Sequence, residues 1–175
     1  TPIVAMGTAA IKASLDFESS FTSVRKTVDA TETEFSALAS ASKSMSTQIA
    51  ASTTEINEVM ATAGQLGIAN DYLVDFPRTV IDLGNSTDIV ANDAASTLAK
   101  FANITTMDQS QFGNLGATLV DLGNNFATVE SDIMNMSLRL AAAGHQVGLT
   151  EPQILGFAAA LSSVGVRAEM GGSAF

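Results

Sequence analysis

Large apolar residues recur at alternating intervals of four and three positions in the N-terminal part of the chain. They are Phe17, Phe21, Val24, Val28, Phe35, Leu38, Met45 and Ile49. Thr31 and Ser42 continue the series where it has no large side chain. This heptad spacing predicts a helix that buries one stripe along its length. We call the eight apolar residues the heptad seam and interpret them as a candidate surface for self-association or docking.

The seam predicts an N-terminal helical arm over residues 1–50. A single helix from residue 17 to residue 49 would be roughly 50 Å long. Thr31 and Glu34, however, have the spacing of a capping box, in which each side chain bonds the other residue's backbone N–H. The sequence therefore leaves two alternatives open, one long helix or two helices with a break near residue 30.

Beyond residue 50, helix start and stop signals follow one another closely. Ser52 with Glu55 predicts a helix start, and the glycines of the AGQLGI segment predict its end at residue 64 or 67. The next helix is expected to begin at Asn70 or Asp71 and to end near Gly84, with Pro77 kinking or shortening it. Residues 51–175 are therefore expected to form a separate, glycine-punctuated unit.

The same signals predict three more helices. Their expected limits are Thr87 or Asp88 to about Asn103, Asp108 to Gly123, and Thr128 to Gly144. Thr150, with Pro152 in the first turn and Gln153 completing a capping box, then opens a final helix that Gly165 closes. The predicted fold class is all-α: a long N-terminal heptad-patterned helix, with or without the break, followed by a bundle of about six short helices.

Two segments of this second part are similar to each other, VIDLGNST at 80–87 and LVDLGNN at 119–125. We interpret them as two helix ends with similar capping chemistry. A repeat fold is the less favoured alternative.

Composition supports helices and excludes several kinds of site. Hydrophobic residues make up 46% of the chain but aromatic residues only 6%, and cysteine and tryptophan are absent. Small side chains suit close helix packing better than a sheet core. Without cysteine there is no disulfide and no thiolate zinc site.

The net charge of −10 disfavours binding to nucleic acid or to an anionic membrane surface, since both require clustered Lys and Arg. No specific nucleic-acid binding is expected. The longest apolar stretch, Ile154 to Val166, contains two serines and is too short to span a bilayer.

Residues for catalysis are scarce, and we predict no enzyme activity, cofactor or metal. His145 is the only histidine and lies at a predicted helix end. Carboxylate pairs of the kind that glycosidases use fall on predicted polar helix faces. They are Glu32/Glu34, Glu55/Glu58, Asp71/Asp75 and Asp88/Asp93. A cell-wall hydrolase is a disfavoured alternative.

Seven segments occur in an order that resembles the core region of bacteriophage tail tape measure proteins. They are FESSFTSVRKTVDAT (17–31), AGQLGI (63–68), DLGNST (82–87), KFANIT (100–105), LGATLVDLGNNFATVESDI (115–133), AAGHQVGLTEPQI (142–154) and ALSSVGVRAEMGGSAF (160–175). The similarity covers essentially the whole chain.

The resemblance implies a structural and assembly protein of a phage or prophage, with no catalytic residues. Proteins of this kind are long, largely helical homo-oligomers that occupy the lumen of the virion tail and set its length. The implied partners are the tail tube protein and the tail assembly chaperones, which the protein meets in the host cytoplasm. Because the chain begins at Thr1 without an initiator Met, we expect it to be a fragment of a longer protein.

An alternative from another functional class is a membrane-active helical effector. It would act through helices rich in small residues, such as GFAAALSSVG at 156–165.

Overall fold

A computed structural model describes residues 2–168, with side chains from residue 11 onward. The described chain is entirely helical, as predicted, with eight α-helices and two short 3-10 helices and no strand within residues 2–168. The α-helices are α1 (Pro2–Thr27), α2 (Glu32–Met45), α3 (Thr53–Gln65), α4 (Asp75–Ser86), α5 (Ala91–Thr105), α6 (Phe112–Asn125), α7 (Glu130–Gln146) and α8 (Glu151–Ser163). The 3-10 helices are η1 (Asn70–Tyr72) and η2 (Gln109–Gln111).

The heptad seam is divided between α1 and α2, with Val28 and Ile49 just beyond their C-terminal ends. α1 ends at Thr27 and α2 begins at Glu32, so a single helix over residues 17–49 is wrong and the alternative with a break near residue 30 holds. The break is stabilised by the predicted capping box. The backbone N–H of Glu34 donates to Thr31 Oγ1 at 3.3 Å, and the backbone N–H of Thr31 donates to Glu34 Oε2 at 2.7 Å.

Pro77 shortens α4 without kinking it. The predicted helix from Asn70 is divided into η1 and α4, and α4 begins at Asp75. Pro77 is then the third helical residue, where its missing N–H leaves no hydrogen bond unmade.

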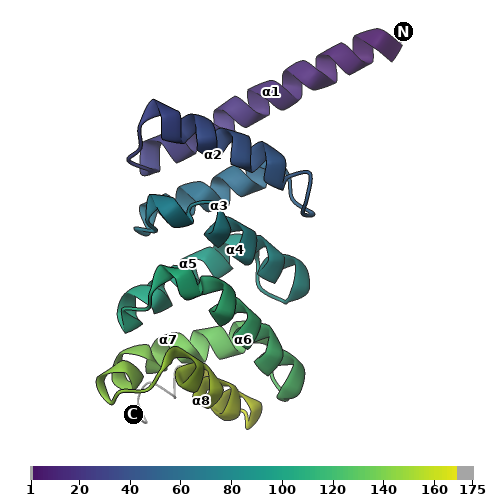
Figure 1. Cartoon of the computed structure of the whole chain (residues 1–175). Coiled ribbons are helices and arrows are strands. Elements are labelled where there is room, and N and C mark those ends of the chain that lie inside the picture. The colour runs from purple at the N-terminus through teal and green to yellow at the C-terminus, as the bar shows by residue number, and fades with distance from the viewer. Residues whose placement is uncertain (1, 169–175) are drawn as a thin grey trace.

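The helices stack in two layers. In one layer α1 packs on α3, α3 on α5, and α5 on α7; in the other α4 packs on α6 and α6 on α8. Figure 1 shows the stack descending from the N-terminal to the C-terminal end, with the first part of α1 projecting beyond it. Six α-helices follow residue 50, close to the predicted number, but they form an open stack in place of a closed bundle.

One hydrophobic core runs through the whole stack. It is a continuous cluster of buried side chains that extends from Phe17 in α1 to Ala159 in α8. By contrast, residues 11–16 of α1 are all exposed.

Equivalent residues in neighbouring helices of one layer are 39 positions apart in the sequence. The motif Asp-Leu-Gly-Asn stands at 82–85 near the end of α4 and at 121–124 near the end of α6. Both helices end in the same way: Thr87 N–H donates to Leu83 O, and Phe126 N–H donates to Leu122 O, each at 2.9 Å. The two similar segments therefore lie at equivalent ends of two helices in one layer, with the similar capping chemistry that the sequence indicated.

The other layer has the same interval between α3 and α5. The C-terminal ends of α3 and α5 both form a 6→1 turn, in which a backbone N–H reaches the carbonyl five residues back. Ile68 N–H donates to Ala63 O and Met107 N–H donates to Ala102 O, both at 3.0 Å. The residues before these donors, Gly67 and Thr106, have positive φ.

Candidate interaction surfaces

The structure brings the heptad seam into the interior. Seven of its side chains are buried: Phe17, Phe21, Val24, Val28, Phe35, Leu38 and Met45. Ile49 is partly buried and packs against the same core. The seam side chains therefore pack within the chain, where α1, α2 and α3 meet. Self-association through the seam remains a prediction, and it would require these helices to separate.

Aromatic rings form the centre of this junction. Phe17 stacks on Phe21 with ring centroids 5.5 Å apart, and Phe35 of α2 meets Phe21 edge-on at 6.4 Å. Two cations cover the outer faces of the rings: the Arg25 guanidinium lies 4.6 Å from the Phe35 centroid, and Lys43 Nζ lies 4.2 Å from that of Phe17. Cation–π attraction at such exposed sites contributes modestly to the junction.

Arg25 also bridges the break between α1 and α2. Its two terminal nitrogens donate to the two carboxylate oxygens of Glu32 at 2.8 and 2.9 Å. This hydrogen bonding lowers the pKa of the Glu32 carboxyl, and bonds from the Thr31 backbone and hydroxyl lower the pKa of Glu34. Because both values lie below those of the unfolded chain, the contribution of these groups to stability is present at neutral pH and lost on acidification.

A buried polar network joins the same three helices. Ser42 Oγ of α2 donates to Asn57 Oδ1 of α3 at 2.6 Å, and Asn57 Nδ2 donates to Ser20 Oγ of α1 at 2.9 Å. Ser20 Oγ in turn donates to the Phe17 carbonyl at 3.0 Å. Ser42 and Asn57 are fully buried, and within the described side chains no buried polar atom lacks a partner. Sequence reasoning missed this network, and its only signal was a serine at a seam position.

Gly64 lets α1 approach α3 closely. A Cβ atom at this position would lie 2.7 Å from Val28 Cγ2 and 2.9 Å from the Thr27 carbonyl oxygen. Since one of these atoms belongs to the backbone, any larger residue would push the C-terminal end of α1 away from α3.

Two residues that were predicted to cap the next helix bond instead to helices distant in sequence. Asp88 does not cap α5 but receives the backbone N–H of Ser131 at 3.0 Å, in the first turn of α7. Thr128 does not cap α7; its hydroxyl lies 2.6 Å from that of Ser162 in the last turn of α8. Capping of α5 and α7 by the residues just before them was therefore wrong, because these side chains bond to helices distant in sequence.

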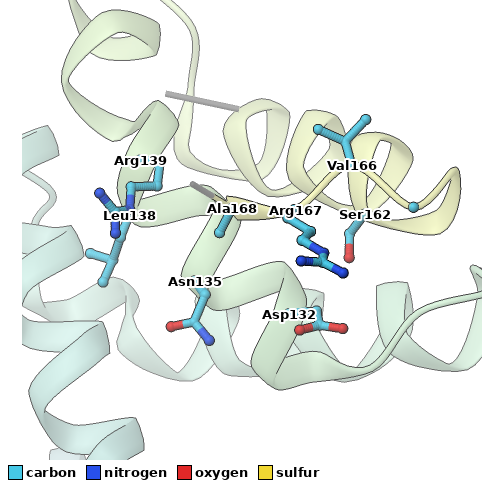
Figure 2. A pocket seen from close by; sticks show the side chains of 9 residues that line it. Asp132, Asn135, Leu138, Arg139, Ser162, Val166, Arg167 and Ala168 are labelled. Atoms are coloured by element: carbon cyan, nitrogen blue, oxygen red, sulfur yellow. The ribbon is translucent and has the colours of Figure 1, made fainter. Parts of the chain in front are cut away.

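Hollows on the stack follow the same 39-residue period. Asp93 and Lys100 of α5 line a hollow against α7, and the equivalent Asp132 and Arg139 of α7 line the next hollow. Figure 2 shows this second hollow, of about 760 Å³, between α7 and the segment that follows α8. Arg167 and Ser162 lie on its other side.

Groups suited to catalysis do not converge in the described part of the chain. His145 is exposed in the last turn of α7. Among the described residues, no three His, Asp or Glu side chains are placed to hold a metal ion. None of the described helices has the length and apolar character needed to cross a membrane. The best-defined interactions in the described part of the chain are contacts between helices.

Comparison with known proteins places the chain among phage proteins. Residues 39–175 match the family described as phage-related minor tail protein. The chain is also 26% identical over 178 residues to a "Probable tape measure protein" of Halomonas phage phiHAP-1. That alignment covers 94% of this chain but 21% of the relative, so the chain spans about a fifth of the relative's length. No solved structure matches the chain. The resemblance to tail proteins is confirmed, and the chain belongs to the phage-related minor tail protein family.

Proposed function

We propose that this chain is a structural segment of a tape measure protein, which occupies the lumen of a phage tail and sets its length. The observation that carries the proposal is the open stack of helices with a 39-residue period, in a chain that matches a tail protein family. In such a quasi-one-dimensional array each repeat contacts only its neighbours. The length of such an array is therefore set by the number of residues in the chain, as a protein that measures tail length requires.

The charge of the chain suits a lumen through which DNA passes. The net charge is −10, and only eight residues are Lys or Arg. Three of these cations are already engaged, Arg25 with Glu32, Lys43 with Phe17 and Arg78 with Gln48. A chain of this kind repels DNA instead of retaining it. The tail tube protein and the tail assembly chaperones are its proposed partners.

The N-terminal arm and the helices that follow it have separate proposed roles. Residues 1–50 would dock or associate, and residues 51–175 would form the repeated part. The exposed start of α1 is consistent with an arm that reaches beyond the stack.

Deleting one repeat tests the proposal. Removal of residues 87–125 from the full-length tail protein joins the end of α4 to Phe126, which follows the equivalent end of α6. We expect tails to become shorter, by up to about 58 Å if the removed residues lie extended as helix at 1.5 Å per residue. Virion tails are measured by electron microscopy.

A length-matched variant provides the control. Replacing residues 87–125 with a second copy of residues 48–86, the preceding repeat interval, should leave tail length unchanged. Deletion virions with tails of normal length would contradict the proposal, as would shortened tails in the length-matched variant.

A further inference from the structure

The hairpin formed by α1 and α2 stands in the same 39-residue relation to α3 and α4 as the later helices do to one another. The positions 39 residues before α3 are 14–26, and they lie within α1. The positions 39 residues before α4 are 36–47, and most of them lie in α2. The interval that relates the later helices therefore extends into the N-terminal part of the chain.

Contacts between helices repeat in the same order. α1 packs on α3, as α3 packs on α5 and α5 packs on α7. α2 also packs on α3, as α4 packs on α5 and α6 packs on α7. In Figure 1 the hairpin of α1 and α2 lies above α3, as the later hairpins lie one above another. Both helices of each hairpin therefore contact the first helix of the next hairpin.

Buried positions coincide at the same interval, although the side chains differ. Two sets cross α1, α3, α5 and α7: Phe17, Ile56, Ala95 and Met134, and Val24, Ala63, Ala102 and Ala141. A third set crosses α2, α4, α6 and α8: Leu38, Pro77, Gly116 and Leu155. Every member of the three sets is buried. The equivalence is one of packing, which is why no sequence motif marks it in α1 and α2.

Two side-chain hydrogen bonds of α1 recur at equivalent positions of later helices. The hydroxyls of Ser20 and Ser137, three intervals apart, each donate to the carbonyl three residues back, at 3.0 and 2.8 Å. The hydroxyls of Thr27 and Thr105, two intervals apart, each donate to the carbonyl four residues back, at 3.1 and 3.0 Å. Bonds of this kind are frequent in helices. Their recurrence in register with the buried positions shows that α1 is aligned with α5 and α7 residue by residue.

We infer that α1 and α2 form the first of four equivalent helical hairpins in the described chain, and that its repeated part starts near residue 14. The four hairpins are α1–α2, α3–α4, α5–α6 and α7–α8. In such an array each unit is stabilised by its contacts with its neighbours. The heptad seam is then the surface through which the first unit packs on the second.

This inference goes beyond the proposed function, in which residues 1–50 are an arm with a separate role. It assigns residues 14–50 to the repeated array and leaves only residues 2–13 outside it. α3, α5 and α7 have no counterpart of this segment, because they begin at positions equivalent to 13 or 14 of α1. The arm of the proposed function is thereby reduced to the first part of α1.

Distances between spin labels in the 175-residue chain test the inference. The chain has no cysteine, and Lys26, Gln65 and Ile104 are exposed residues at equivalent positions of α1, α3 and α5. The substitutions Lys26→Cys, Gln65→Cys and Ile104→Cys are made in pairs, and labelled chains are diluted with unlabelled chains. Because packed neighbouring helices lie about 8–10 Å apart, we expect similar 26–65 and 65–104 distances and a longer 26–104 distance.

The matched control is Lys12→Cys/Lys26→Cys, with both labels in α1. Fourteen helical residues give about 21 Å between these positions whether or not α1 is packed on α3. A 26–65 distribution as short and as narrow as the 65–104 distribution supports the inference. With the control at its expected distance, a 26–65 distribution that is much longer or broader overturns it, because α1 and α2 would then be a separate arm. Tail length does not enter this measurement, so failure here is distinguishable from failure of the proposed function.

Discussion

Replacing Phe21 and Val28 with aspartate is expected to detach α1 from α3 and to unfold the N-terminal end of the stack. Phe21 is 4% exposed and Val28 8%, and both side chains belong to the core. The nearby Arg25 guanidinium, 5.9 Å from the Phe21 ring centroid, is already paired with Glu32. Burying an unpaired charge is costly, and loss of the aromatic contacts with Phe17 and Phe35 adds to it. We expect a loss of stability of at least about 4 kcal/mol.

Urea denaturation followed by circular dichroism measures this effect. The matched control is Thr22→Asp/Ser23→Asp, which adds the same charge at two exposed positions of α1. Its stability should stay within about 0.5 kcal/mol of the parent for each substitution. If the seam variant unfolds at the same urea concentration as the control, the seam is not the docking surface that holds α1.

Replacing Asn57 with alanine is expected to destabilise the junction of α1, α2 and α3 by about 2–4 kcal/mol. The substitution removes the acceptor of the Ser42 hydroxyl and the donor to Ser20, and all three residues are buried. It leaves the buried Ser42 hydroxyl without its acceptor and opens a small cavity, while the Ser20 hydroxyl keeps its bond to the Phe17 carbonyl. Free energies of unfolding from chemical denaturation give the magnitude.

Two further variants show whether the loss of stability in Asn57→Ala comes from the broken hydrogen-bond network. Asn92→Ala removes an exposed asparagine of α5 and should change the free energy of unfolding by less than about 0.5 kcal/mol. The triple variant Ser20→Ala/Ser42→Ala/Asn57→Leu removes every polar partner together, and we expect it to be more stable than Asn57→Ala. Equal stabilities for Asn57→Ala and Asn92→Ala would show that the network contributes nothing to the junction.

Local chemistry in the sequence predicted the helices well. The break near residue 30 follows from the Thr31–Glu34 capping box, in which all partners lie within four residues. The α8 start follows in the same way, with the backbone N–H of Thr150 donating to Gln153 Oε1 at 2.9 Å. The shortening of α4 by Pro77 is also local, because it depends on the absence of one N–H group.

The arrangement of the helices could not be predicted in this way. Asp88 bonds to Ser131, 43 residues later, and Asn57 to Ser20, 37 residues earlier. The heptad seam indicates which stripe of α1 and α2 is buried but not which helix covers it. The seam packs on α3 because α1 approaches α3 closely at Gly64. The spacing of apolar residues does not reveal that contact.

The 39-residue period was visible only in part. The Asp-Leu-Gly-Asn motif recurs in α4 and α6, but in α8 the corresponding residues, 160–163, are Ala-Leu-Ser-Ser. The third copy shares the position of one leucine and the pattern of burial. Ile154, Leu155 and Ala158 are buried like Leu115, Gly116 and Leu119, which precede them by 39 residues. Such equivalence is a property of the packed helices, and it becomes clear only when the layers are seen together.

Distances between spin labels at three equivalent positions test the open, periodic stack most directly. The chain has no cysteine, so Asp82, Asp121 and Ala160 can be replaced by cysteine in pairs and labelled without further changes. Labelled chains are diluted with unlabelled chains, so that contacts between copies do not contribute. Because neighbouring packed helices lie about 10 Å apart, we expect similar 82–121 and 121–160 distances and an 82–160 distance close to twice either of them. An 82–160 distance as short as the other two would mean that the helices close into a bundle, and it would contradict this account.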